Sequence, residues 1–384
     1  MLQSHITGLG ISEFSRTADR AIGEIAVEAA LLAIEDAELV RGDIDGLIVA
    51  HSSVGTCEPL GLSLQAQLGL GDLQLLQDVH AEGSSAMQML HNAALYTSMG
   101  MVRHVLCVWA DAPLTPGQSS GTTFNVTVPH GNLEGWEAAH GLFGAASAYA
   151  LCARRHMARY GTTTDHLGAV AVTARTWATG NPRAIMRTPL TLDEHRASPL
   201  IADPFRRLDC SFPVNGGAAF LVSADTAAVG SSNGRVRIAG LGQGHRSNYH
   251  YAGAEPEVET AAGIAAAQAL RMADVVLGDI DICELYDCFT YTTIVLLEDL
   301  GFCEKGAGGD FVREGNIAPG GSIPTNTGGG QLSGHYLQGM TPLCEAIIQL
   351  RGDGGDRQVP DAEVALVHGH GGILNFHACA VLTR

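Results

Sequence analysis

The sequence predicts a layered α/β protein made of two similar halves, because one pattern of residues occurs twice along the chain. In each copy a short strand with two glycines is followed by an alanine-rich helical stretch, then GDID, then an apolar strand. The first copy occupies 5–10, 24–39, 42–45 and 46–51, and the second occupies 237–242, 259–275, 278–281 and 282–287. A fixed order of matching segments is typical of an internally duplicated fold.

Each half continues with a further helix and strand. The segment 83–100 leads into the apolar strand 104–111, and 339–352 leads into 364–371. Short, continuously apolar strands that alternate with helices indicate a mostly parallel, buried sheet. We therefore expect two β-α-β-α-β halves, packed in layers.

The two halves are expected at 1–235 and 236–384, and the first is longer because of an insertion at about 112–200. The insertion begins with an irregular polar stretch and then becomes helical over 141–161. Long insertions in compact domains are usually lids or binding loops, so this one is predicted to cover a substrate. Its larger apolar side chains fit either a pocket for a steroid ring system or the core of the lid; they are Phe124, Trp136, Leu142 and Phe143.

Composition excludes several classes of protein. A net charge of −18 argues against nucleic-acid binding, which needs clustered Lys and Arg. No apolar run approaches the roughly 20 residues that span a bilayer, so no membrane association is expected. Nine cysteines without a CxxC pair and without a signal peptide indicate a reducing cytoplasm. Lys305, the only lysine, lies in a polar glycine-rich turn, which argues against Schiff-base chemistry.

Four motifs, in this order, resemble the thiolase superfamily across essentially the whole chain. They are HAEGSSAM (80–87), ELYDCFT (284–290), PTNTGGGQLSGHYLQG (324–339) and HGHGG (368–372). The resemblance is to the branch of sterol-carrier-protein thiolases and thiolase-like lipid-transfer proteins, and it implies a thiolase fold.

The departures from the family pattern concern its chemistry. His80 stands where thiolases carry the nucleophilic cysteine, so the acyl-enzyme route of that family is not expected. The loop that holds their second catalytic cysteine reads Gly369-His370-Gly371-Gly372. In this the chain is most similar to thiolase-fold aldolases that remove steroid side chains from acyl-CoA thioesters.

That resemblance implies a carbon–carbon lyase that cleaves a β-hydroxyacyl-CoA, such as a 17-hydroxy steroid 20-carboxyl-CoA, into a ketone and a short acyl-CoA. It also implies a homodimer that pairs through the strand near 104–110. A heteromer with a small zinc-ribbon/OB-fold acyl-CoA-associated protein is implied as well. No cofactor is expected beyond the coenzyme A of the substrate.

A retro-aldol reaction needs a base for the hydroxyl proton, donors for the enolate oxygen and an acid for the α-carbon. Tyr286 and Tyr336 are the candidates for base and acid, provided that a neighbour such as His335 lowers a tyrosine pKa. His335 is also the expected enolate donor, supported by the backbone N–H groups of Gly371 and Gly372.

The remaining candidates have supporting roles. His80 and His370 are expected to line the pocket. Asn326 and Asp287 are expected to support the residues that line it. The pair His368 and His370 could bind zinc, but no carboxylate has ligand-like spacing, so no metal is predicted. Two other functions stay open: a non-catalytic acyl-CoA-binding subunit, and an acetyl-CoA acyltransferase with an unusual nucleophile.

Overall fold

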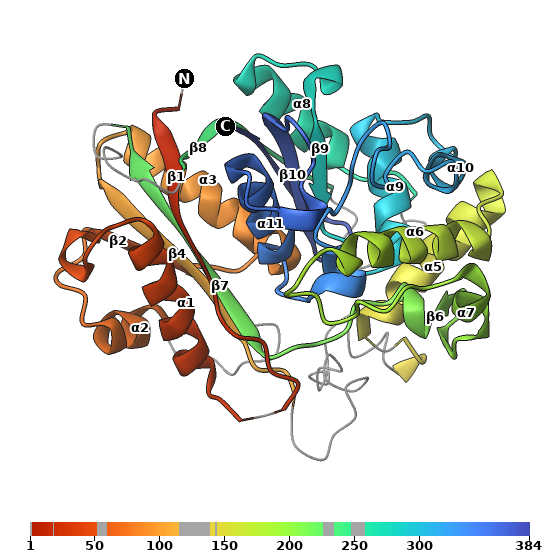
Figure 1. Ribbon diagram of the computed structural model, residues 1–384, viewed down its shortest axis with the longest axis horizontal. Helices are drawn as coiled ribbons and strands as arrows, with labels where there is room; N and C mark the ends of the chain where they lie inside the picture. The colour runs from red at the N-terminus through yellow and green to blue at the C-terminus, as the bar shows by residue number, and fades with distance from the viewer. Residues whose placement is uncertain are drawn as a thin grey trace.

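The computed structural model describes residues 2–17, 19–51, 60–114, 139–142, 144–225, 234–246 and 258–384. Its main feature is a nine-stranded sheet in the order β3-β2-β4-β7-β1-β8-β11-β10-β9 (Figure 1). The strands span Ser4–Ile11 (β1), Gly46–Ala50 (β2), Leu75–Val79 (β3), His104–Asp111 (β4), Gly216–Ala224 (β7), Val236–His245 (β8), Ile282–Leu285 (β9), Val364–Gly371 (β10) and Phe376–Thr383 (β11).

The described helices cover both halves and the insertion. They span Ile22–Asp36 (α1), Leu60–Leu68 (α2), Ser85–Ser98 (α3), Gly144–Tyr160 (α5), Thr164–Thr179 (α6), Leu192–Ala197 (α7), Ala262–Ala273 (α8), Thr290–Leu300 (α9), Gly308–Arg313 (α10) and Met340–Arg351 (α11). Strands β5 (Leu200–Ala202) and β6 (Phe205–Arg206) form a separate ribbon.

The expectation of a mostly parallel sheet was wrong. Among the described strands, five of the eight neighbouring pairs in the main sheet are antiparallel and three are parallel. Four of the five antiparallel pairs involve two strands that the sequence pattern did not predict, β7 and β11, and the fifth joins β1 to β8. Each runs antiparallel to both of its neighbours, β7 between β4 and β1 and β11 between β10 and β8.

The repeated GLG and alanine-rich segments have one physical cause, which is close packing of a strand on a helix. A Cβ atom on Gly8 would lie 2.2 Å from the Ala33 carbonyl oxygen of α1. In the second half a Cβ atom on Gly240 would lie 2.0 Å from the Ala269 carbonyl oxygen of α8. Only glycine permits this approach of strand to helix backbone, so the same composition occurs in both halves.

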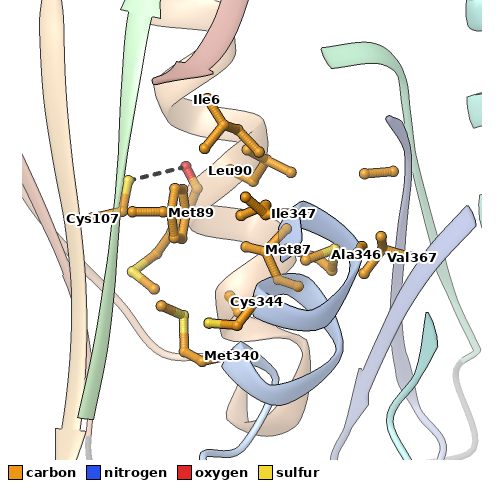
Figure 2. Packing of buried hydrophobic residues seen from close by; sticks show 14 of the residues in the cluster. Ile6, Met87, Met89, Leu90, Cys107, Met340, Cys344, Ala346, Ile347 and Val367 are labelled. Carbon is orange, nitrogen blue, oxygen red and sulfur yellow. Dashed lines mark hydrogen bonds between the residues drawn. The ribbon is translucent and has the colours of Figure 1, made fainter. Parts of the chain in front are cut away.

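Helices α3 and α11 form the centre of the protein, between the strands of the two halves (Figure 1). Their facing side chains are apolar and rich in sulfur: Met87 and Met89 on α3 meet Met340 and Cys344 on α11 (Figure 2). All four are at most 2% exposed. Methionine adapts its shape to irregular gaps, which suits a core where two copies of one fold meet.

The described part of the insertion packs on the second half. Helix α6 contacts α9, α10 and the segment Gly330–Gly334, and α7 packs on α6 (Figure 1). Of the predicted apolar pocket residues, Leu142 is partly buried, whereas Phe124, Trp136 and Phe143 lie outside the described residues.

The strand proposed for pairing across a dimer is not available for it. Strand β4 is paired with β7 over His104–Asp111 and, on its other side, with β2 over Val105–Val108. The edge of the first half is β3, which pairs with β2. An edge strand presents unpaired N–H and C=O groups, so β3 is the strand of this half that could extend the sheet.

Lys305 is held in ion pairs. Its ammonium lies 2.6 Å from the Asp299 carboxylate and 3.2 Å from the buried Glu298 carboxylate at the end of α9. A Schiff base would require this amine to leave both ion pairs. That Lys305 forms none stays a prediction.

Candidate active site

Two tyrosines from separate motifs meet at the centre of the candidate site. Tyr286 directly follows β9, and Tyr336 lies in the extended segment before α11. Their phenolic oxygens are 3.2 Å apart, a hydrogen bond in which either can donate, and the residues are 6% and 7% exposed. The sequence motifs ELYDCFT and SGHYLQG thus supply one buried pair of hydroxyl groups.

The start of α3 forms one wall of this site. Gly83 lies so close to the Tyr286 ring that a Cβ atom there would be 2.4 Å from the ring and 2.2 Å from the His370 carbonyl oxygen. The glycine therefore allows the tyrosine to occupy the place beside the helix N-terminus. The motif HAEGSSAM and the loop after β10 converge on the same point.

His370 is brought to the tyrosines, but both of its ring nitrogens are engaged. Nε2 lies 3.1 Å from the Tyr286 carbonyl oxygen, and Nδ1 lies 3.3 Å from the Tyr149 hydroxyl. A carbonyl only accepts, so Nε2 carries the proton and Nδ1 accepts from Tyr149. His370 thus supports the pocket rather than offering a free N–H group to a ligand.

Tyr149, on α5 of the insertion, was not predicted as a site residue. It is 4% exposed, and its ring packs on Phe289 with centroids 4.9 Å apart. The helical stretch around it is apolar, and nothing in its spacing separates a site tyrosine from a core tyrosine. Its contact with His370 spans 221 residues of sequence, so only the folded chain shows it.

Burial controls the ionisation of the site. It raises the pKa of Tyr286 well above its ordinary value, and the nearby Tyr336 hydroxyl raises that pKa further. Burial raises the pKa of Tyr149 in the same direction and lowers the pKa of His370 well below its ordinary value. The expectation that a neighbour lowers the pKa of a site tyrosine is therefore wrong for Tyr286: desolvation disfavours the phenolate.

His335 faces a different cavity. The backbone at His335 is extended, so its side chain and that of Tyr336 point to opposite sides. Its ring packs on that of Phe14, with centroids 4.4 Å apart and planes tilted by 36°. The imidazole lines a cavity together with Arg183 and Glu284. Burial, with Arg183 and Arg357 nearby, lowers its pKa to about 3. The structure thus does not bring this imidazole to the tyrosine pair.

The other predicted residues lie around the pocket. His80 is exposed, and its ring lies 5.2 Å from that of His51. The Gly372 N–H group donates to the Glu82 carboxylate over 2.7 Å, so this predicted enolate donor is already engaged. Gly371 lies against Ala81 and Glu82, with no space for a Cβ atom.

Asn326 lies next to the end of β9. Its side-chain oxygen accepts from the Leu285 N–H group over 2.6 Å, which fixes the end of β9 just before Tyr286. Asp287 likewise accepts from the Gln331 N–H group over 2.8 Å, and burial raises its pKa to about 7.

Glu82 is a second residue that the sequence analysis missed. It has a left-handed φ of 47°, is exposed, and opens the short helical turn Glu82–Ser84 that precedes α3. Its carboxylate ties this turn to Gly372, just after β10. Its position inside HAEGSSAM, two residues after His80, is the signal that could have identified it.

The histidines of β10 and β11 bind each other rather than standing ready as ligands. His368 Nε2 lies 3.0 Å from His377 Nδ1, and His377 Nε2 donates to the Leu374 carbonyl oxygen over 2.8 Å. In the part of the chain that the structure describes, no group of three or more His, Cys, Asp or Glu residues could hold a metal ion.

Residues 242–384 match the family described as thiolase C-terminal domain-like. The chain is 32% identical to the 17-hydroxy-3-oxo-4-pregnene-20-carboxyl-CoA lyase of Mycobacterium tuberculosis, over 91% of this chain and 92% of that protein. The chain belongs to the thiolase superfamily. It lies in the sterol-carrier-protein and lipid-transfer branch, near the steroid side-chain-cleaving aldolases, as the motifs predicted.

Other relatives of this thiolase-superfamily chain include both aldolases and acyltransferases. It is 31% identical to the steroid side-chain-cleaving aldolase of Thermomonospora curvata, with 90% of each chain covered. It is also 31% identical to an acetyl-CoA acetyltransferase of Methanothermobacter thermautotrophicus, with 99% of each covered.

The solved structure of the Ltp2-ChsH2(DUF35) aldolase matches with a TM-score of 0.89 at 30% identity, covering 100% of this chain and 98% of that one. These comparisons confirm the predicted thiolase fold and the prediction of an enzyme, an aldolase of thiolase fold. Among the described residues, no helix is both long and apolar enough to cross a membrane.

Proposed function

We propose that this protein is a retro-aldolase that cleaves a β-hydroxyacyl-CoA thioester into a ketone and a shorter acyl-CoA. The observation that carries the proposal is the buried pair of tyrosine hydroxyls, 3.2 Å apart. Burial raises the pKa of Tyr286, so a stored phenolate is disfavoured and the pair acts as neutral hydroxyls.

The reaction suits such a pair because it conserves protons. The β-hydroxyl loses a proton, the bond between the α- and β-carbons breaks, and its electrons form the thioester enolate. The α-carbon of that enolate then gains a proton. One tyrosine accepts the hydroxyl proton while its own proton passes to the second tyrosine, and the second tyrosine gives its own proton to the α-carbon, so each hydroxyl ends with one proton. No free phenolate is needed at any stage, and positioned acid–base transfer of this kind typically contributes about 10²–10⁴-fold in rate.

The substrate that we propose is a 17-hydroxy steroid 20-carboxyl-CoA. Support comes from the relative named 17-hydroxy-3-oxo-4-pregnene-20-carboxyl-CoA lyase, which aligns over nine tenths of both chains. The coenzyme A is part of the substrate, and the proton transfers proposed for Tyr286 and Tyr336 require no further cofactor.

We also propose two assemblies and a location. One assembly is a homodimer, for which β3 rather than β4 is the available edge. The other is a heteromer with a small zinc-ribbon/OB-fold acyl-CoA-associated protein, supported by the similarity to the Ltp2-ChsH2(DUF35) aldolase. A cytoplasmic location is supported by the eight described cysteines, all of which are unpaired thiols.

The test is to incubate the chain with 17-hydroxy-3-oxo-4-pregnene-20-carboxyl-CoA, alone and after co-purification with the products of neighbouring genes. We expect release of the 17-ketone and a short acyl-CoA, detected by mass spectrometry. In deuterated water the acyl-CoA should carry one deuterium at its α-carbon. The matched control is the same thioester without the 17-hydroxyl group, which has no proton to lose and should remain intact.

Two outcomes would contradict the proposal. An acyl adduct on the intact protein would indicate an acyltransferase, the activity of one relative. No turnover in the presence of the partner, together with tight acyl-CoA binding, would indicate a non-catalytic subunit.

A further inference from the structure

His370 has two possible neutral tautomers, and its surroundings select one. The Tyr286 carbonyl oxygen, 3.1 Å from Nε2, can only accept, so it requires the proton on Nε2. The Tyr149 hydroxyl, 3.3 Å from Nδ1, can donate to the nitrogen that is left without a proton. If the proton moved to Nδ1, the lone pair of Nε2 would face that of the carbonyl oxygen and the bond to Tyr286 would be lost.

The position of His370 in turn sets that of Tyr286. The two rings meet edge to face, with centroids 4.7 Å apart and an interplanar angle of 70°. The backbone of Tyr286 is bonded on its other side too, because its N–H group donates to the His368 carbonyl oxygen over 3.1 Å. His370 therefore contacts both the main chain and the ring of the residue whose hydroxyl pairs with Tyr336.

Tyr149 is itself fixed by a cluster of aromatic side chains. Its ring packs on Phe289, which stacks on Phe205 with centroids 5.0 Å apart and planes 12° apart. Tyr149 and Phe205 belong to the first half of the chain, whereas Phe289 and His370 belong to the second. The contact between Tyr149 and His370 thus joins the insertion of one half to the site of the other.

We propose that Tyr149 is a positioning residue: its hydroxyl holds the His370 ring in place, and the Nε2–H group of that ring, bonded to the Tyr286 carbonyl oxygen, holds Tyr286 in register with Tyr336. The inference rests on the proposed retro-aldolase function for its kinetic consequence, but not for the hydrogen bonds of His370. Tyr149 does not pass a proton to the pair through His370, because the chain of hydrogen bonds ends at a carbonyl oxygen, which has no proton to hand on.

The test measures the tautomer directly. The full-length protein is labelled with ¹⁵N-histidine, and the His370 signals are assigned by their loss in His370→Gln. We expect one protonated and one unprotonated ring nitrogen in the parent protein, with Nε2 protonated. In Tyr149→Phe, which keeps the ring and removes the hydroxyl, we expect the Nδ1 signal to move toward that of an unprotonated ring nitrogen that accepts no hydrogen bond, while Nε2 stays protonated.

Kinetics give a second reading. Loss of one hydrogen bond that orients Tyr286 should lower kcat by about tenfold and leave the KM for the thioester within about twofold. In the His370→Gln background, whose amide donates whichever way Tyr149 is substituted, Tyr149→Phe should have no further effect. Tyr160→Phe is the matched control, because it removes a hydroxyl from the same helix and should change neither the His370 shifts nor kcat.

The outcomes separate the two proposals. Unchanged His370 shifts in Tyr149→Phe would overturn the positioning role, whatever the activity. Shifts that move as expected in a protein without lyase activity would support the positioning role of Tyr149 and contradict the proposed function. If Tyr149→Phe does not fold, Tyr149→Met keeps an apolar side chain in the same space and gives the same two readings.

Discussion

Removal of either hydroxyl of the tyrosine pair gives the most direct prediction. Tyr286→Phe and Tyr336→Phe each keep an aromatic ring in a buried position and remove one of two oxygens that lie 3.2 Å apart. The net contribution of such a hydrogen bond to stability is about 1 kcal/mol, so both variants should fold. Differences in activity then report on chemistry rather than on loss of the protein.

The expected kinetic loss follows from the proposed proton transfer. Each single variant interrupts the pair, so each should lower kcat by about 10²–10⁴-fold, the usual contribution of positioned acid–base catalysis. Residues that act as one unit are not additive, so the double variant should be no slower than the slower single variant. If the two hydroxyls acted independently, the losses would multiply instead.

The assay is single-turnover release of the ketone, with thermal unfolding measured on the same samples. Multiplied losses in the double variant would refute the reasoning that the two tyrosines form one proton-transfer unit. Full activity in either single variant would refute the assignment of that tyrosine. A rise in KM with an unchanged kcat would indicate that the pair binds substrate and takes no part in proton transfer.

Three further predictions concern pH. Because burial raises the pKa of Tyr286, kcat should show no alkaline decline below pH about 10 in a pH–rate profile, and a decline near pH 8 would contradict a neutral pair. Burial raises the pKa of Asp287 from 3.8 to about 7, so its ionisation lowers the stability of the folded protein as pH rises through that interval. In chemical unfolding, Asp287→Asn should therefore have a free energy of unfolding higher than that of the parent protein by up to about 4 kcal/mol at pH 8 and by little at pH 4. Burial lowers the pKa of His377 from 6.5 to about 4, so the free energy of unfolding should fall by about 3 kcal/mol as pH falls across that interval. A free energy of unfolding that stays constant between these pH values would exclude this role for His377.

The fold could be predicted from the sequence where local pattern and packing agree. Gly8 and Gly240 occur in matching positions because each lets a strand touch a helix backbone, and the duplicated halves follow from that. The predicted strands 104–111 and 364–371 coincide with β4 and β10, since both are continuous apolar runs. Strands β7 and β11 were missed because they lie outside the repeated pattern, and with them the antiparallel pairing was missed.

The site was predictable to the level of motifs but not of side-chain direction. Tyr286, Tyr336 and His370 meet because the motifs mark the loops that converge on α3. The side chain of His335 points away from Tyr336 because the backbone there is extended, a property that a motif does not encode. Tyr149 and the upward shift of the pKa of Tyr286 depend on long-range burial, which no local pattern reports.

Lys305 gives the protein a built-in reporter. The chain has one lysine, and its amine lies between the carboxylates of Asp299 and the fully buried Glu298. An amine-directed reagent therefore has one side-chain target, and two ion pairs hold that amine against carboxylates while the end of α9 is intact. The rate at which Lys305 becomes labelled would measure how often this part of the second half opens, in unmodified protein and with no engineered probe.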